Sequence, residues 1–177
     1  FIRSLYIDIK GNVWAGTVQK GFNMLDVSTG KFQRYTVPGN NSNVNPGSVF
    51  SFIPEHNTSN SLWICSDAGL FSLDRSTGLF TSHNIYKDEK VRNRGIIAAC
   101  MDSSGVLWLS TYNEGLHKYY ESCSKFRSYK YDNGNSSGLS GSNVKCFCED
   151  KTGNLWIGTD NGLNRYDRTN NEFIYYF

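Results

Sequence analysis

Charged, amide and aromatic residues that could bind a ligand gather in two loop-like segments of the chain. Arg92, Asn93 and Arg94 form one segment, and Tyr112, Asn113 and Glu114 form the other. An aromatic ring beside guanidinium, amide and carboxylate groups suits a sugar, and a uronic or sulfated glycan in particular. Ordinary solvated loops are the alternative for each residue. Gln19 and Lys20 stand at the place in the first part of the chain that corresponds to Asn113 and Glu114. The candidate ligand-binding set is therefore Arg92, Asn93, Arg94, Tyr112, Asn113, Glu114, Gln19 and Lys20.

The residues that commonly carry catalysis form no such set. The sequence holds no Gly-x-Ser-x-Gly elbow, and its paired aspartates fall in repeated turn positions, where a structural role is sufficient. We therefore expect no catalytic residues and no cofactor.

The cysteines stand at 65, 100, 123, 146 and 148 and include no Cys-x-x-Cys pair. Buried free thiols that act as small hydrophobes explain four of the five. Cys146 and Cys148 share one strand face and could together bind a metal ion. The sequence places no histidine or carboxylate near them as a further ligand. We expect no metal site.

A repeat organises the whole chain. The tryptophans are spaced 45 to 49 residues apart, each within a matching pentad such as Leu-Trp-Ile-Gly-Thr. A glycine follows each tryptophan after six or seven residues, and a phenylalanine stands 11 positions beyond that glycine. The members of the repeat are Trp14, Trp63, Trp108, Trp156, Gly21, Gly69, Gly115, Gly162, Phe32, Phe80, Phe126 and Phe173.

Within each copy, apolar residues alternate with a period of two, which predicts strands. In the last copy we predict strands at Val144–Glu149, Leu155–Thr159, 163–166 and 173–177. Asn161-Gly162 predicts a hairpin turn in which both residues take a positive φ. Asp-x-x-Gly-x-x-Trp, as in Asp150, Gly153 and Trp156, predicts a type I turn with glycine in the left-handed region.

Four short antiparallel strands repeated every ~47 residues indicate an all-β fold of β-propeller blades. We expect a partial propeller over 1–177, with blades at about 1–36, 48–86, 95–131 and 143–177, as a slice of a larger ring. The second-strand tryptophan and fourth-strand phenylalanine should fill the space between blades. A small residue two positions after the tryptophan should let sheets approach closely. A closed four-bladed ring and an eight-bladed ring of two copies are the alternatives.

The composition agrees with this fold and excludes other classes. The chain has 4 Ala and 6 Glu against 21 Ser and 19 Asn, which disfavours helices. A net charge of +2 without a basic block argues against nucleic-acid binding, and 15% aromatic residues argue against disorder. No apolar run approaches the ~20 residues that span a bilayer.

The unit from Glu149 to Asp167, Glu-Asp-Lys-Thr-Gly-Asn-Leu-Trp-Ile-Gly-Thr-Asp-Asn-Gly-Leu-Asn-Arg-Tyr-Asp, closely resembles the two-component regulator propeller repeat. The first copy, from Lys10 through Phe32, is similar, and the second and third copies match more loosely. The resemblance covers essentially the whole chain. It is carried by the tryptophan pentads, the glycines and the phenylalanines of the repeat.

The resemblance implies the extracytoplasmic, carbohydrate-detecting sensor of a hybrid two-component histidine kinase in a phosphorelay. It implies a periplasmic location as part of an inner-membrane protein, with further blades and a β-sandwich as partners in the parent chain. It also implies an oligosaccharide ligand, and we keep a homodimer as a hypothesis. The sequence around His56, His83 and His117 shows no phosphoacceptor box, so kinase activity would belong to the parent. The alternatives are a standalone lectin-like or protein-interaction propeller and a polysaccharide-degrading propeller enzyme.

Overall fold

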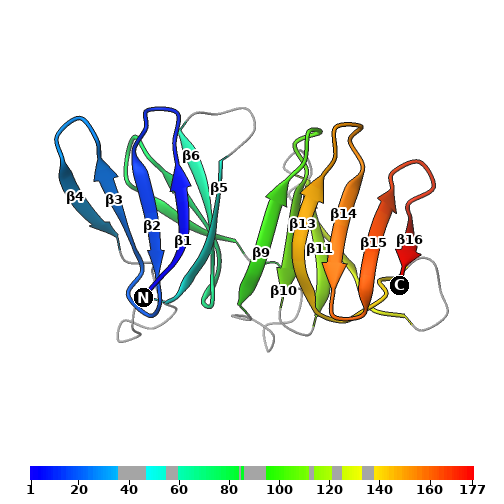
Figure 1. The fold of residues 1–177 in the computed structure, drawn as a ribbon. Coiled ribbons are helices and arrows are strands. Elements are labelled where there is room, and N and C mark those ends of the chain that lie inside the picture. Colours follow the sequence, from blue (N-terminus) through cyan, green and yellow to red (C-terminus); the bar gives the residue numbers. More distant parts are fainter. Residues whose placement is uncertain are drawn as a thin grey trace. The chain divides into compact units, whose positions relative to one another are not determined.

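The computed structural model describes residues 1–35, 47–54, 60–83, 85, 95–111, 114–120, 125–132 and 138–177, without the side chains of residues 120 and 125. The chain divides into two compact units, Phe1–Ile96 and Ile97–Phe177, each taken by itself below. In the described segments the regular elements are all strands (Figure 1). Accordingly, no helix in these segments is long and apolar enough to cross a membrane.

The strands form four antiparallel sheets, each with its members in sequence order. We call the sheets blades 1 to 4. Blade 1 is β1 (Ile2–Ile7), β2 (Val13–Thr17), β3 (Phe22–Asp26) and β4 (Lys31–Tyr35). Blade 2 is β5 (Val49–Pro54), β6 (Ser61–Ser66), β7 (Gly69–Asp74) and β8 (Phe80–His83). Blade 3 is β9 (Ile96–Met101), β10 (Leu107–Thr111), β11 (Gly115–Tyr120) and β12 (Lys125–Tyr129), and blade 4 is β13 (Val144–Glu149), β14 (Leu155–Thr159), β15 (Gly162–Asp167) and β16 (Glu172–Tyr176).

The all-β prediction is confirmed, and the strand predictions for the last copy are right to within a residue at each end. The predicted turn chemistry is confirmed as well. Asp102 Oδ1 accepts hydrogen bonds from the N–H groups of Ser104 (2.9 Å) and Val106 (3.0 Å), and Gly105 has φ 76°. The turn closes because the carboxylate binds the N–H groups that the bend exposes.

The prediction for Asn161-Gly162 is wrong in one respect. Gly162 has φ 113°, but Asn161 is not among the residues with positive φ. The Asn161 N–H donates to Thr159 Oγ1 at 3.2 Å, and Thr159 is paired with Gly162. Asp160 and Asn161 therefore form the two-residue connection, and glycine takes the left-handed conformation at the start of β15.

Each sheet has two faces that we name by the repeat residues they carry, the tryptophan face and the phenylalanine face. Strand alternation separates them, since Trp14 pairs with Met24 while Phe32 pairs with Leu25. In the first unit the tryptophan face of blade 1 packs on the phenylalanine face of blade 2, where Trp14 shares a core with Phe52 and Phe80.

The second unit repeats this arrangement. The tryptophan face of blade 3 packs on the phenylalanine face of blade 4, and the rings of Trp108 and Tyr166 lie 4.9 Å apart. Phe173 belongs to the same core. The predicted role of the repeat residues between blades is therefore confirmed within each unit.

Phe32 is an exception to that role, because it is 73% exposed and the described residues leave the phenylalanine face of blade 1 open. The predicted close approach of sheets is confirmed at Gly16. A Cβ there would lie 2.8 Å from the Val49 carbonyl oxygen of blade 2. The requirement is steric, since a real Cβ contact that short essentially never occurs.

The prediction that four cysteines are buried is wrong. Cys65 is buried, and burial raises the pKa of its thiol to about 12. Cys100 is half-buried, whereas Cys146 and Cys148 are exposed. The last two lie on the tryptophan face of blade 4, which the described residues leave open. Cys123 lies outside the described residues.

Candidate functional site

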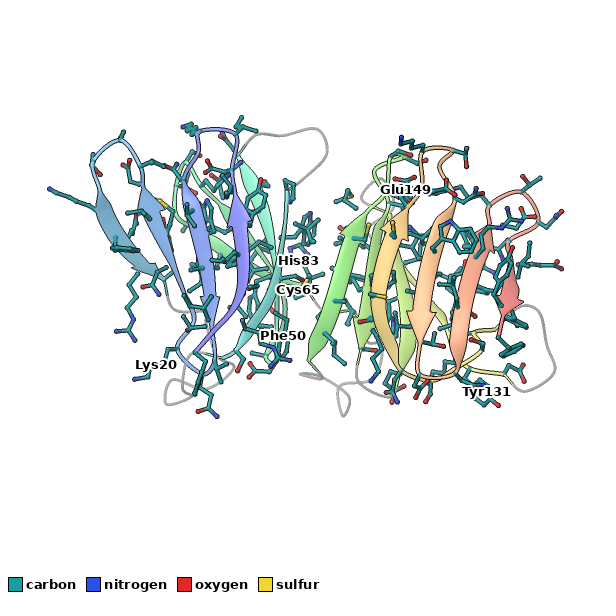
Figure 2. The ribbon with its side chains drawn as sticks, viewed as in Figure 1. Lys20, Phe50, Cys65, His83, Tyr131 and Glu149 are labelled. Atoms are coloured by element: carbon teal, nitrogen blue, oxygen red, sulfur yellow. The ribbon has the colours of Figure 1, made fainter. Side chains whose placement is uncertain are left out.

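The blades have two chemically different ends. The Asp-x-x-Gly turns lie at one end, which we call the turn end. The connection between the second and third strands lies at the other, which we call the connector end. Figure 2 shows Lys20 at the connector end of blade 1. In the second unit the same figure shows Glu149 at the turn end and Tyr131 at the connector end.

Gln19 and Lys20 lie in the connection between β2 and β3. Gln19 takes φ 60°, and its N–H donates to Ser48 Oγ of the next blade at 3.1 Å. The Gly21 N–H donates to the Gly47 carbonyl oxygen at 3.1 Å. These bonds fasten the connection to the entry of blade 2 and leave the side chains of Gln19 and Lys20 exposed.

Glu114 occupies the equivalent connection of blade 3. Its Oε2 atom accepts a hydrogen bond from Lys130 Nζ at 2.8 Å, and Lys130 is followed by the exposed Tyr131. Gly115 brings the two segments together, since a Cβ there would lie 3.2 Å from the Cα atom of Lys130. The second unit thus offers an ion pair and an aromatic ring at its connector end.

Five predicted ligand-binding residues cannot be placed. They lie outside the described residues and stay predictions: Arg92, Asn93, Arg94, Tyr112 and Asn113.

A buried amide anchors the connector end of blade 4. Asn164 is fully buried, and its Oδ1 atom accepts a hydrogen bond from the Ser140 N–H at 2.8 Å. Its Nδ2 group donates to the Ile157 carbonyl oxygen at 3.2 Å. Asp160 binds the same incoming segment, accepting from Asn143 Nδ2 at 2.8 Å. The buried Asn164 amide, with partners for both its oxygen and its nitrogen, therefore holds the incoming segment to blade 4 and favours one conformation there.

His117 occupies the position of Asn164 in blade 3. Its ring nitrogens lie 3.1 Å from Thr111 Oγ1 and 2.9 Å from Ser128 Oγ. Burial lowers the pKa of His117 to about 4, so the ring is neutral at pH 7. It is a structural member of the blade interior.

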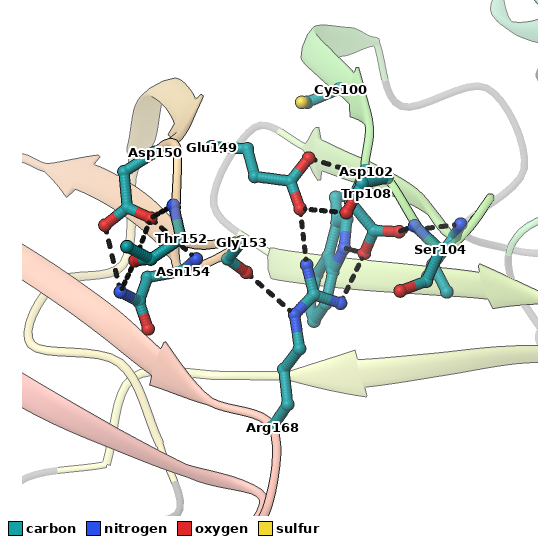
Figure 3. Close-up of polar contacts among 12 residues, drawn as sticks. Cys100, Asp102, Ser104, Trp108, Glu149, Asp150, Thr152, Gly153, Asn154 and Arg168 are labelled. Carbon is teal, nitrogen blue, oxygen red and sulfur yellow. Dashed lines mark hydrogen bonds and ion pairs between the residues drawn. The ribbon is translucent and has the colours of Figure 1, made fainter.

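The turn end carries an ionic contact between blades 3 and 4 (Figure 3). Asp102 Oδ2 accepts hydrogen bonds from Trp108 Nε1 at 2.7 Å and from Arg168 at 2.8 Å. Arg168 comes from the β15–β16 turn of blade 4, and it also pairs with Glu149 Oε1 at 3.1 Å. Burial opposes ionisation of Asp102, but the Trp108 and Arg168 hydrogen bonds outweigh it and hold its pKa below the ordinary value.

The same contact joins blades 1 and 2. Asp8 Oδ2 accepts from Trp14 Nε1 at 3.1 Å and from Arg75 of the β7–β8 turn at 3.3 Å. Arg75 Nε donates to the Asn60 carbonyl oxygen at 3.3 Å, as Arg168 Nε donates to that of Gly153 at 3.1 Å. We call this arrangement of tryptophan, aspartate and the neighbouring blade's arginine the Trp–Asp–Arg contact.

The sequence contains a local signal for this contact. An arginine follows the aspartate that begins the third turn in blades 2 and 4, as Asp74-Arg75 and Asp167-Arg168. In blade 1 the same place holds Asp26-Val27. The aspartate itself stands in three of the four blades, since blade 3 has Tyr120 at this place, and the residue that follows it varies.

In the described part of the chain no group of three or more histidine, cysteine, aspartate or glutamate side chains is placed to hold a metal ion. Cys123 and His56 lie outside it.

The four sheets and the packing of tryptophan face on phenylalanine face identify the fold as β-propeller blades. Residues 138–161, which lead into and begin blade 4, match the family described as two component regulator propeller. Blade 4 therefore carries a repeat of this family, as the resemblance predicts. A search of curated proteins gave no match.

Solved structures extend the similarity to nearly the whole chain. The extracellular domain of the putative hybrid two component system BT4673 from B. thetaiotaomicron is 25% identical with a TM-score of 0.78, covering 92% of this chain and 21% of that one. The corresponding domain of BT3049 from the same organism is 22% identical with a TM-score of 0.78, covering 98% and 23%. The chain therefore spans about a fifth of the length of these structures.

An enzyme propeller shares the fold alone. Virginiamycin B lyase from Staphylococcus aureus is 15% identical with a TM-score of 0.73, over 99% of this chain and 55% of that one.

Proposed function

We propose that this chain is part of the extracytoplasmic sensor of a hybrid two-component histidine kinase and contributes to detecting a carbohydrate outside the cytoplasm. The main support is the similarity to the extracellular domain of a putative hybrid two component system over 92% of the chain. The regulator propeller repeat at 138–161 adds to it. In this proposal the chain performs no chemistry, and the membrane anchor lies elsewhere in an inner-membrane parent.

The carbohydrate part of the proposal rests on the connector end of the second unit. There the Glu114–Lys130 ion pair adjoins Tyr131, which is 45% exposed. An exposed aromatic ring can stack on the apolar face of a sugar, and the charged groups can bind its hydroxyl or carboxylate groups. Tyr112 and Asn113 precede Glu114 in the sequence and are proposed to complete the site.

Signalling then follows from differential affinity. A ligand that binds one arrangement of the sensor more tightly shifts its population toward that arrangement, and the shift is passed to the kinase. The anchored connector end of blade 4 suits a platform that presents ligand rather than a part that moves.

A glycan array followed by calorimetry on the full chain tests the binding part. We expect a uronic or sulfated oligosaccharide to bind, and Tyr131→Ala and Lys130→Ala each to weaken it at least about tenfold. Lys151→Ala is the matched control, because Lys151 is an exposed lysine at the turn end and should leave affinity unchanged. Absence of any glycan ligand, or equal binding by all three variants, would contradict the assignment.

The signalling part needs the parent protein. Addition of the glycan found in the array should change autophosphorylation of the parent kinase, and the Tyr131→Ala variant should need about tenfold more of it. Glycan binding without any change in phosphorylation would favour the standalone lectin-like alternative.

A further inference from the structure

A hollow of about 360 Å³ lies between blades 1 and 2 at the turn end of the first unit. Small-molecule sites occupy ~300–1,000 Å³, so this volume suits one small ring rather than a large ligand. Both walls of the hollow belong to one compact unit, because the two blades share a core. The lining includes Trp14, Met24, Tyr35, Gln33, Asn60 and Lys10.

The second unit shows which side chains fill the corresponding place. Tyr129 corresponds to Tyr35, and its Oη atom donates to Asn171 Oδ1 at 2.8 Å. Tyr166 Oη lies 3.4 Å from Tyr129 Oη and donates to the same Asn171 oxygen at 2.6 Å. A phenol and an amide from blade 4 therefore close this place and satisfy the tyrosine hydroxyl of blade 3.

The first unit lacks both of these groups. Strand register and turn position put Leu73 in the place of Tyr166, and Gly78 in the place of Asn171. A Cβ at Gly78 would meet nothing within 4 Å, so the space beside this turn is open. Tyr35 is half-buried, and within the described part of the chain its hydroxyl group has no hydrogen-bond partner. This arrangement favours a ligand that offers the hydroxyl a hydrogen bond, because an unpaired buried polar group costs stability.

The charged groups of the lining do not require a charged ligand. Asp8 and Arg75 already pair with each other at 3.3 Å. Lys10 is exposed to solvent, where its ammonium group keeps its hydration.

The neutral groups of the lining define the chemistry of the ligand. Gln33 and Asn60 bring amide side chains, which both donate and accept hydrogen bonds. Met24 and the ring of Tyr35 form an apolar wall beside them. A pyranose ring matches this combination, because it has an apolar face of C–H groups and hydroxyl groups around its edge.

We infer that the hollow between blades 1 and 2 binds one neutral pyranose ring of a carbohydrate, with sugar hydroxyl groups paired to Tyr35 Oη and to the amides of Gln33 and Asn60. The class of ligand rests on the proposed function, whereas the place rests on the difference between the two units. This site is at the turn end of the first unit, and the proposed function uses the connector end of the second.

Titration of the full chain with D-glucose, D-galactose, D-mannose and L-fucose, each alone, tests the inference by heteronuclear NMR of the tryptophan indole groups. We expect at least one sugar to shift the Trp14 indole signal with a Kd of about 1–10 mM, since one small ring makes few contacts. The Trp108 signal should not move, because Tyr166 and Asn171 fill the corresponding place.

Two substitutions should weaken this binding. Gly78→Asn should weaken it at least about tenfold, because the new amide takes the place of Asn171 and binds the tyrosine hydroxyl itself. Asn171 has φ 57° and Gly78 has φ 75°, so asparagine fits this turn. Tyr35→Phe should weaken binding about fivefold by removing one hydrogen bond.

Gly30→Asn is the matched control. Gly30 holds the equivalent position in the turn of blade 1, with φ 67° and nothing within 4 Å of its Cβ, and it does not line the hollow. It should leave affinity unchanged. The inference is overturned if no sugar shifts the Trp14 signal, if Trp108 shifts equally, or if Gly78→Asn binds as tightly as Gly30→Asn.

The failure of this inference is distinguishable from failure of the proposed function. Without a Trp14 shift, a glycan whose binding depends on Tyr131 would still support the connector end. A Trp14 shift together with unchanged glycan binding by Tyr131→Ala would support the hollow and contradict the connector-end assignment.

Discussion

Blades 1 and 2 meet through the same central side chains as blades 3 and 4, but the residues around those side chains differ. Both pairs have the Trp–Asp–Arg contact, with matching donors and acceptors. Around it, blade 1 places Met24 and Tyr35 against the apolar residues Phe71 and Leu73 of blade 2. In the second unit the same positions are Lys118, Tyr129, Asn164 and Tyr166.

The second contact is therefore polar as well as aromatic. Lys118 Nζ lies 4.8 Å from the centre of the Trp108 ring and 3.2 Å from Tyr166 Oη. Tyr166 and Tyr129 both donate to Asn171 Oδ1, at 2.6 Å and 2.8 Å. Asn171 has φ 57° and holds the place of Gly78 in blade 2.

In the first contact the residues that blade 2 places around the Asp8–Arg75 pair are apolar, and a hollow remains beside the pair. A hollow of about 360 Å³ lies beside the Trp–Asp–Arg contact, lined by Trp14, Met24, Tyr35 and Arg75 among others. Pro54 stands where Glu149 gives the second unit an additional carboxylate. Two different sets of side chains thus surround the same Trp–Asp–Arg contact. This contact holds neighbouring blades together, whereas the residues around it are free to vary.

The largest loss of stability is expected when the buried tryptophan is removed. Trp108→Ala should lower the free energy of unfolding by about 3–5 kcal/mol, because it leaves a large cavity in a packed core. Trp156→Ala is the matched change on an open face and should cost less than half as much. Urea denaturation followed by circular dichroism measures both. Equal losses would contradict the account of covered and open faces.

The next effect concerns the arginines. Arg168→Met should cost about 3 kcal/mol, because it leaves the buried Asp102 carboxylate without its cation. Arg75→Met should cost about 1 kcal/mol less, since Asp8 lies farther from its arginine and no equivalent of Glu149 is present. A larger loss at Arg75 would reverse the ranking of the two contacts.

The pH dependence of Arg168→Met provides a further check. The native pKa of Asp102 is depressed, so its contribution is complete above the ordinary value of 3.8 and disappears as the pH falls through the native value. The difference in unfolding free energy between wild type and Arg168→Met should therefore shrink below pH 3.8.

His117 makes blade 3 sensitive to pH in a way that blades 1 and 4, with Asn23 and Asn164 at this place, are not. Its native pKa is about 4 against an ordinary 6.5, so the unfolded chain binds the proton first. About 3 kcal/mol of stability should be lost as the pH falls from 6.5 to about 4. His117→Asn should flatten this part of the profile, as thermal unfolding at several pH values would measure. An unchanged slope would contradict the buried neutral ring.

The smallest effect is expected for Lys118→Met, which gives the second contact the residue of the first. It should change stability by less than about 1 kcal/mol, because an apolar side chain of similar size replaces a buried polar one. The reverse change, Met24→Lys, should cost about 1–3 kcal/mol, since Phe71 and Leu73 provide no acceptor. Equal losses of unfolding free energy for Lys118→Met and Met24→Lys would contradict the proposed difference in polarity between the two contacts.

Period-two patterning and the four tryptophan pentads were sufficient to predict the strands, the blade class and the role of Trp14 and Phe173 between sheets. These features depend on local alternation and on spacing that is visible in the chain. The exposure of Phe32 and Cys148 was not predictable, because it depends on whether another sheet covers a face. Asn161 was mispredicted because its neighbour Thr159 offers the backbone a competing side-chain acceptor.

The candidate ligand residues were predicted from type and loop position alone, and their role as ligand contacts stays a prediction. Gln19 and Lys20 expose their side chains as expected, but the pairing of Glu114 with Lys130 joins residues 16 positions apart and has no local signal. Arg75 and Arg168 were missed because their partners, Asp8 and Asp102, lie one blade earlier, beyond the reach of a pattern within one repeat.

A double-mutant cycle on Asp102 and Arg168 tests most directly the claim that the Trp–Asp–Arg contact joins neighbouring blades. Asp102→Asn, Arg168→Met and the double variant are compared with the wild type by urea denaturation at pH 7. We predict a coupling free energy of about 1–3 kcal/mol between the two side chains. Additive losses, with a coupling near zero, would show that the two residues stabilise their own blades separately and would contradict the account.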